Sequence, residues 1–564
     1  MKFKDMVYTR PDIEKIKAVL IDLEKRILSA QNENEVKEAY LKSEEISREY
    51  ETMCSLAYVR HTIDTKNKFY DEENSFFDKN GPLVSDMFRK INLALLKSKF
   101  RPILEENFGK LLFTNIELMV KSSSSETVEQ RAKENELMSE YQRLFASASV
   151  EWEGKTIPLP MLGIYKQSAD RNVRKKAFLK DAEFFSANKK EFDRLYNELV
   201  KNRNCQARML GYDNFIQMGY DRLGRNCYGP DEVADFRNEI VSLIVPAVSE
   251  LKKAQAERIG VEKLHLYDND LMFKEGNVKP TGSADEILSS GIKMYKEMSD
   301  RTGEFITFME KNELFDLLSS AGKAPGGYCT EFPTYKAPFI FSNFNGTSAD
   351  VDVLTHEAGH AFAYYTAARK GLLSSYISPT IEACEVHSMS MEFLTMPWHK
   401  EFFGDNTDRY EYFHAADSLN FIPYGCMVDE FQHIMYENEQ LTPGERDEIW
   451  LSLEKKYRPH LHLDDLPFYS EGGGWQRQLH IYMYPLYYID YCMAGAVAFG
   501  FFAESIKDRQ KAMDKYFTFV DGAGTKTFEE LVRDAGLPVP YEKGALKNTV
   551  DTIRKWLTVQ EKKV

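Results

Sequence analysis

The chain has 564 residues, carries a formal net charge of −15 and is 43% hydrophobic. A chain this acidic is poorly suited to nucleic acid or to an anionic membrane, so neither is expected as a partner. Its length and apolar content suffice for several hydrophobic cores. The 7 cysteines are scattered and include no C-x-x-C pair, which is typical of reduced thiols in a cytoplasmic protein and not of a disulfide framework.

Helical patterns dominate the first half of the chain. Residues 11–145 contain few glycines and prolines, and their apolar residues recur at steps of three and four. This spacing predicts several long helices. A short strand-and-turn passage is expected at 152–160, after which helical patterns resume at 172–209 and at 230–259.

Strand-like sequence is concentrated between Gly326 and Asn345. The next residues, 345–350, have the turn and N-cap chemistry that starts a helix. Residues 351–370 contain no proline and have helical spacing, and Gly371 stands where a C′ glycine is expected. The sequence therefore predicts a strand that leads directly into a long helix.

This predicted helix contains the sequence His356-Glu357-Ala358-Gly359-His360. Residues i and i+4 lie on one face of a helix, so both imidazoles can bind one metal ion. Glu357 is then placed to act as general base on a water molecule that the metal makes more acidic. The motif indicates a hydrolytic metal site.

A catalytic zinc site needs a third protein ligand, and a second proline-free stretch, 380–396, supplies candidates. Glu382, Glu385 and Glu392 fall at i−3, i and i+7 on one helical face, and Glu385 is the best candidate for the ligand. The other carboxylates can orient the histidines. The alternative is three glutamates on an exposed, solvated face. Cys384 is less suited than Glu385 because neighbouring helical residues point about 100° apart.

A row of polar aromatic residues follows the glycine run 472–474. Counted from His480, the positions +4, +7, +8 and +11 are all tyrosines: Tyr484, Tyr487, Tyr488 and Tyr491. Helical spacing would place them along one stripe. The alternative to a functional stripe is an aromatic core, but a buried version would need a partner for every polar group. We expect the stripe to line a wet cleft and the glycine run to form a mobile loop.

The apolar segment 492–503 is far shorter than the roughly 20 residues that span a bilayer, so it is expected to be a buried helix. The N-terminus lacks the apolar region of a signal peptide.

The motif at 356–360, followed by Glu385-Val386-His387-Ser388-Met389-Ser390-Met391-Glu392, resembles the signature of the M3 oligopeptidases, the family of thimet oligopeptidase, neurolysin and oligoendopeptidase F. The length and pattern are most similar to the oligoendopeptidase F and Pz-peptidase branch. Ala358 stands where mammalian members have Phe, so their substrate preferences are a poor guide.

The resemblance assigns roles to individual residues. It implies that His356, His360 and Glu385 bind one zinc ion, that Glu357 is the general base and that Glu392 supports a ligand from behind. It also implies that His480 and a pair of tyrosines, Tyr488 and Tyr491, hydrogen-bond the substrate and the oxyanion. Tyr487 competes with this pair because the offset from His480 is one residue shorter than in the mammalian enzymes.

The resemblance further implies a mostly α-helical, two-lobed, neurolysin-like fold with a deep substrate channel and a small β element beside the zinc helix. We expect an N-terminal helical lobe at 1–190 and a catalytic region at 191–564. The expected activity is endopeptidase cleavage of short, unfolded peptides, with the segment 335–343 offering a backbone edge to the extended substrate. A Taq-type zinc carboxypeptidase and a non-catalytic peptide-binding module are the alternatives. The sequence does not fix the oligomeric state.

Overall fold

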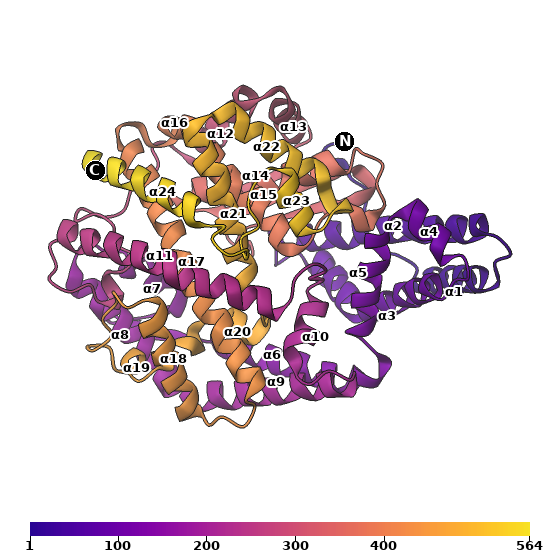
Figure 1. The fold of residues 1–564 in the computed structure, drawn as a ribbon, viewed down its shortest axis with the longest axis horizontal. Coiled ribbons are helices and arrows are strands. Elements are labelled where there is room, and N and C mark those ends of the chain that lie inside the picture. The colour runs from indigo at the N-terminus through magenta and orange to yellow at the C-terminus, as the bar shows by residue number, and fades with distance from the viewer. The chain divides into compact units, whose positions relative to one another are not determined.

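The computed structural model describes residues 1–564, and most of the chain is α-helical (Figure 1). This confirms the predicted fold class. The chain forms two compact units, each assembled from three segments. The first unit comprises Met1–Val120, Lys279–Thr407 and Gly500–Leu537, and the second comprises Lys121–Val278, Asp408–Phe499 and Pro538–Val564.

The two units are interleaved along the sequence, and no border between them falls at residue 190. The predicted division into 1–190 and 191–564 describes regions of sequence and stays a prediction. Compact units are defined by contacts in space, which helical periodicity does not report.

The first unit begins with three long helices, α1 (Ile13–Ser29), α2 (Glu33–Ile63) and α3 (Lys68–Leu96), which pack against one another in pairs (Figure 1). Each begins at a polar residue whose side chain accepts a backbone N–H: Asp12, Asn32 and Asn67. Their apolar faces form one core, in which Leu20, Ala39 and Ile91 are buried. The helices expected from the spacing in this region are therefore present.

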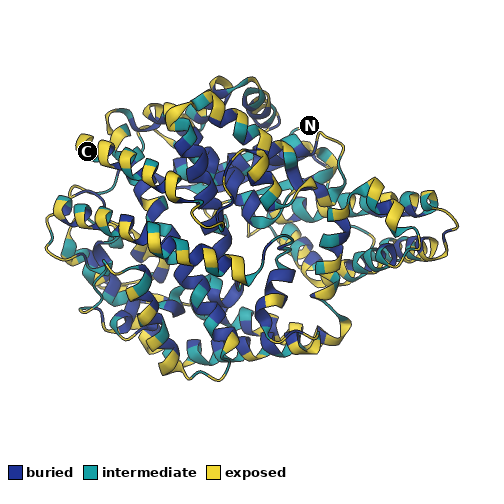
Figure 2. Cartoon of the chain, viewed as in Figure 1, coloured by how far each residue is buried: buried dark blue, intermediate teal, exposed yellow.

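The remaining helices of this unit are α4 (Arg101–Phe108), α5 (Lys110–Lys121), α12 (Ala284–Met298), α13 (Asp300–Lys311), α14 (Ala349–Ala367), α15 (Ile381–Leu394), α16 (His399–Phe403), α22 (Arg509–Gly522) and α23 (Phe528–Asp534). Buried residues lie mainly on the inner faces of the helices, and the outer turns carry the exposed ones (Figure 2).

A three-stranded sheet precedes α14 and has the order β3-β5-β4, with β3 at Phe315–Leu318, β4 at Tyr328–Phe332 and β5 at Ala337–Phe344. The expectation that the segment 335–343 offers a free edge is wrong. This segment forms β5, the central strand, and its backbone pairs with β3 on one side and β4 on the other. The strand β4 lies at the edge of the sheet, and its backbone edge away from β5 has no partner strand in the sheet.

The second unit contains α6 (Val128–Ala146), the hairpin β1 (Ser149–Trp152) and β2 (Lys155–Pro158), α7 (Leu162–Lys166), α8 (Arg171–Ala187), α9 (Lys189–Met209), α10 (Phe215–Arg222), α11 (Pro230–Ile259), α17 (Thr407–Glu437), α18 (Pro443–Tyr457), α19 (Pro467–Ser470), α20 (Leu479–Met483) and α24 (Lys547–Gln560). The helix expected at 230–259 is present with these bounds. The helical stretch expected at 172–209 is divided at Asn188.

The helix α21 (Tyr488–Lys507) contains the apolar segment 492–503. By length and composition alone it could cross a membrane, but 78% of its most apolar window is buried inside the structure. It is packed as a core helix, as the sequence predicted.

Candidate functional site

The backbones of α14 and α15 come into direct contact at Gly359. A Cβ atom at this position would lie 2.6 Å from the carbonyl oxygen of His387 and 2.6 Å from the Cα atom of Ser388. These distances are far below van der Waals contact, so only glycine permits this crossing. The Tyr516 hydroxyl, on α22, donates a hydrogen bond of 2.8 Å to the same His387 carbonyl.

The start of α14 is fixed by a turn after β5. The Asp350 carboxylate accepts the backbone N–H groups of Asn345 at 2.9 Å and of Gly346 at 2.7 Å. The helix begins at Ala349, and the Ser348 side chain makes no capping bond. The predicted turn is therefore present, and Asp350 binds the N–H groups of the turn itself, whereas the N-cap residue Ser348 makes no capping bond to the helix.

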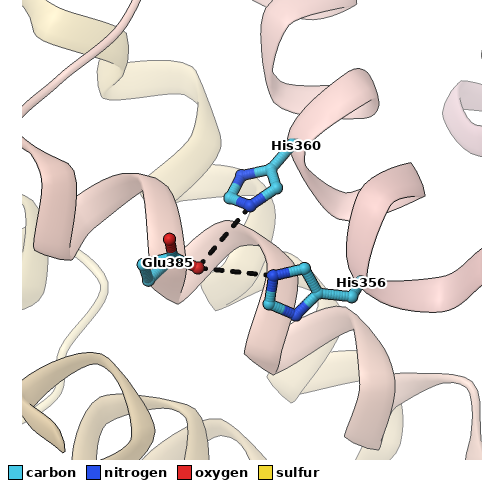
Figure 3. Close-up of side chains that lie close together, drawn as sticks. All are labelled: His356, His360 and Glu385. Atoms are coloured by element: carbon cyan, nitrogen blue, oxygen red, sulfur yellow. Dashed lines mark ion pairs between the residues drawn. The ribbon is translucent and has the colours of Figure 1, made fainter. Parts of the chain in front are cut away.

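The crossing brings His356, His360 and Glu385 together, as the sequence predicted (Figure 3). The Glu385 Oε2 atom lies 3.4 Å from His356 Nε2 and 3.6 Å from His360 Nε2. Zinc bonds of about 2.0–2.2 Å in a tetrahedral arrangement place neighbouring ligand atoms about 3.3–3.6 Å apart. The three side chains therefore have the donor atoms and the spacing that one such ion requires.

Two further contacts orient these side chains. The Nδ1 atom of His356 is 2.7 Å from Glu392 Oε1, which turns its Nε2 toward Glu385. The Ser388 hydroxyl is 3.2 Å from Glu385 Oε2 and donates to it. A carboxylate behind a metal-binding histidine fixes the ring and makes its free nitrogen a stronger ligand.

The charges in the cluster are strongly coupled. Burial raises the pKa of Glu385, but the hydrogen bonds and charges of His356 and His360 outweigh burial and hold the pKa well below its usual range. Deprotonated carboxylate is the form that binds a metal. The carboxyl group of Glu357 has the opposite balance, since burial raises its pKa despite both histidines and a hydrogen bond from the Cys329 backbone. The carboxyl groups of Glu385 and Glu357 therefore differ in acidity.

The remaining carboxylate of α15, Glu382, is only 1% exposed and accepts a hydrogen bond of 2.7 Å from the Thr380 hydroxyl. Glu385 is only 7% exposed. The alternative of three solvated glutamates is therefore wrong. Cys384 lies outside the cluster of possible ligands.

A cavity of about 190 Å³ lies beside His360, with Cys329, Glu331, Tyr364 and His387 in its wall. A neighbouring cavity of about 550 Å³ shares Glu331 and Tyr364 with it. Cys329 and Glu331 belong to the edge strand β4. Strand-like sequence was predicted here, but a place for this strand in the site was not, although the glycine pair before it and Pro333 after it mark its limits.

The aromatic stripe of the second unit does not lie on one helix. The helix α20 ends at Met483 and α21 begins at Tyr488, with Leu486 in the left-handed region at φ 63° between them. The predicted continuous helix is wrong because Pro485 has no N–H group and its ring blocks the preceding turn. The ring of His480 nevertheless contacts all four tyrosines, at centroid distances of 4.7 Å for Tyr488 and 6.3 Å for Tyr491.

Buried polar side chains hold the turn between α20 and α21. Gln432 accepts the backbone N–H of Leu486 at 3.0 Å, and Arg225 bonds both the Leu486 carbonyl and, at 2.7 Å, the Asp490 carboxylate. Arg203 donates to the Tyr482 carbonyl at 2.6 Å. Three side chains from outside the turn therefore supply hydrogen bonds where the helix is interrupted.

The aromatic rings are not a sealed core. His480, Tyr487, Tyr488 and Tyr491 are partly exposed, and Tyr484 is 52% exposed. The glycine run has a packing role instead, since a Cβ at Gly472 would lie 2.3 Å from the Asp447 carbonyl oxygen and one at Gly473 would lie 2.3 Å from the Phe468 ring. Mobility of this run stays a prediction.

Comparison with known families assigns the chain. Residues 164–550 match the model of peptidase family M3, and residues 3–123 match the model of the peptidase M3 N-terminal domain. The chain belongs to peptidase family M3. It is therefore a peptidase of a family whose members are generally metallopeptidases, which agrees with the His-His-Glu group on α14 and α15.

The structure of Pz peptidase A with an inhibitor is similar to this M3 peptidase, with 44% identity, a TM-score of 0.92 and coverage of 99% of this chain and 100% of the other. The oligoendopeptidase F homolog of Borreliella burgdorferi is 22% identical over 69% of this chain and 66% of its own length. The oligoendopeptidase F of Lactococcus lactis subsp. cremoris is 24% identical over 62% of this chain and 58% of its own length. The matches thus span less than two thirds of these two relatives.

The contact at Gly359 generates a prediction about stability and metal binding. Gly359→Ala should lower the free energy of unfolding by about 1–3 kcal/mol, because the new methyl group must push α15 away from α14. The same displacement moves Glu385 from the histidines and should reduce metal content. Gly81→Ala is the control, since Gly81 lies within α3 with nothing near its Cβ position, and it should be neutral or stabilising. Thermal unfolding and metal analysis of both variants test this; equal behaviour would contradict it.

The two carboxylates that face His356 should differ in their effect on metal retention. Glu385→Gln replaces the carboxylate between the two histidines with a neutral amide and should weaken metal binding far more than Glu392→Gln, which weakens only the support of the His356 ring. Titration of each variant with a competing chelator measures this order. The reverse order would make Glu392 the ligand.

Proposed function

We propose that this M3 peptidase is a zinc-dependent endopeptidase that hydrolyses internal bonds of short, unfolded oligopeptides, with one zinc ion per chain. The observation that carries the proposal is the cluster of His356, His360 and Glu385, with Glu357 on the turn between the two histidines. The relatives named oligoendopeptidase F support cleavage within the peptide over removal of terminal residues.

Imidazole nitrogens and a carboxylate oxygen are typical zinc donors, and their spacing fits a tetrahedral ion with one position open. When bound, zinc supplies a Lewis acid that polarises the scissile carbonyl and makes a water molecule more acidic. Glu392 and Ser388 keep the ligands oriented, through His356 and Glu385 respectively.

Glu357 is proposed to handle the protons. The residue is only 9% exposed, and burial raises the pKa of its carboxyl group, which favours holding a proton until it is returned. It accepts a proton from the attacking water and gives it to the leaving amine. Its contact with the Cys329 backbone places it beside the strand β4.

The edge of β4 is proposed to bind the peptide backbone. An extended peptide can add to an open sheet edge through main-chain hydrogen bonds, and β4 has such an edge. A peptide aligned along β4 passes Cys329 and therefore Glu357. The cavity beside His360 is of a size to receive one substrate side chain, with Glu331 and Tyr364 in its wall.

His480, Tyr488 and Tyr491 are proposed to stabilise the oxyanion that forms during hydrolysis. They belong to the second unit, whereas the metal-binding cluster belongs to the first. Their partial exposure supports a role in contact with substrate. Tyr487 is also partly exposed and remains the competing donor.

A peptide ladder tests the proposal as a whole. Peptides of roughly 5 to 20 residues, which extend about 3.3 Å per residue, should be cut at internal bonds. Folded proteins should resist, because their backbone groups are already hydrogen-bonded and cannot pair with β4. Mass spectrometry of the products checks both points. Stepwise release of single C-terminal residues would instead favour a Taq-type carboxypeptidase, and binding of the peptides without any cleavage would favour a binding module.

Glu357→Gln should abolish hydrolysis and leave the metal bound, since the change removes the base and none of the three ligands. A chelator should inactivate the wild-type protein, and added zinc should restore it. Metal content and turnover are measured on the same samples. Loss of stoichiometric metal from Glu357→Gln would contradict a purely catalytic role.

Tyr491→Phe distinguishes a catalytic role of the Tyr491 hydroxyl from a structural one. If the hydroxyl donates to the oxyanion, kcat should fall on the order of 10²-fold with a smaller change in KM. Tyr488→Phe should act similarly or more mildly. Tyr484→Phe is the control, because Tyr484 is exposed and should be nearly silent. Wild-type kcat with a lowered melting temperature would indicate a structural hydroxyl instead.

A further inference from the structure

Gln478 lies between the proposed oxyanion donors and a buried part of the second unit. It is the residue between the 3₁₀ turn Gly473–Arg477 and α20, and its backbone N–H donates to the Trp475 carbonyl at 3.0 Å. Trp475 is fully buried, and its indole N–H donates to Asp447 Oδ1 at 2.9 Å. The backbone of Gln478 is therefore anchored, and its side chain starts from a fixed point.

The carboxamide of Gln478 bridges two aromatic side chains. Its Nε2 atom is 2.8 Å from His480 Nδ1, and its Oε1 atom accepts a hydrogen bond of 2.8 Å from the Tyr424 hydroxyl. Tyr424 comes from α17, and its ring lies 4.8 Å from the Arg458 guanidinium. Tyr424 thus holds the oxygen of the amide on the side away from His480.

These contacts decide where the proton of a neutral His480 ring lies. An amide NH₂ only donates, so His480 Nδ1 must accept, and the single proton of the neutral ring lies on Nε2. Burial lowers the pKa of His480, which favours the neutral ring. Nε2 makes no hydrogen bond within the chain and is free to donate to a ligand.

We infer that Gln478 is a positioning residue that presets His480 as a hydrogen-bond donor toward the substrate, with the Tyr424 hydroxyl donating to the oxygen of its amide. The inference rests on the proposed function of His480. In the opposite amide orientation, His480 Nδ1–H would donate to Gln478 Oε1, and Nε2 would have no proton to give to an oxyanion. The glutamine therefore sets this donor before substrate arrives, which is the condition for effective electrostatic stabilisation.

The first experiment measures the tautomer directly in the wild-type protein. NMR of protein with ¹⁵N-labelled histidine, with the His480 signals assigned from a His480→Asn variant, should show a bare Nδ1 and a protonated Nε2 at neutral pH. A proton on Nδ1 would overturn the inference. This measurement needs no variant of Gln478 to fold and does not depend on activity.

The second experiment replaces Gln478 with residues of similar size. Gln478→Met removes both N–H donors and should lower kcat by about 10- to 100-fold with little change in KM or metal content. Gln510→Met is the matched control, because Gln510 is exposed on α22, and it should behave as wild type. Wild-type kcat in Gln478→Met would overturn the inference.

Gln478→Glu gives a readout that a structural role would not produce. The new carboxylate accepts the Nδ1–H of His480 and raises the pKa of the ring. Below that pKa both ring nitrogens are protonated and Nε2 can still donate; above it the one remaining proton lies on Nδ1 and donation is lost. The ratio of the variant's kcat to that of the wild type should therefore fall as pH rises, and a ratio independent of pH would overturn the inference.

His480→Ala distinguishes the inference from its premise. A large fall in kcat for His480→Ala together with wild-type kcat for Gln478→Met would overturn the inference alone. Wild-type kcat for His480→Ala would remove the proposed function of His480, and the inference with it. A fall in both supports the two together.

Discussion

The contact between α14 and α15 at Gly359 is the constraint on which the metal-binding cluster depends. Two helices approach closely only where side chains are absent at the crossing, and here the backbone of His387 and Ser388 fills the place of a Cβ atom. The crossing lies one residue from His360 and two residues beyond Glu385. A single missing methyl group therefore sets the distance between ligands that come from different helices.

Around this crossing, carboxyl groups of the same chemical type have different pKa values because their surroundings differ. The Glu385 carboxyl faces two imidazoles, which hold its pKa low, whereas burial raises that of Glu357. Glu392 reaches the nitrogen of His356 that points away from Glu385. Burial disfavours charge for both Glu385 and Glu357, and the number of close cationic or hydrogen-bonding partners decides the direction in which each pKa moves. Carboxyl groups of different acidity can thus coexist within one cluster.

The aromatic cluster of the second unit is built by a different principle. A proline interrupts the helix, and buried arginine and glutamine side chains complete the hydrogen bonds of the turn. The interruption turns His480 toward Tyr488, at a ring distance of 4.7 Å, although the two residues start on separate helices. Polar groups inside the structure specify this turn where local propensity would not.

The sequence by itself determined the helical class, the helix that carries His356 and His360, and the second helix with Glu385, because each depends on local periodicity or on a motif within one turn. It also predicted that His480 and the tyrosines lie together. Its predictions were wrong where contacts between distant segments decide the structure. It predicted an exposed edge for β5, which pairs with β3 and β4 on its two sides, and one continuous helix across Pro485, where α20 and α21 are separate. Strand order, the closeness of α14 to α15 and the bridge from Tyr424 through Gln478 to His480 arise from tertiary packing, which pairs residues that no local pattern connects.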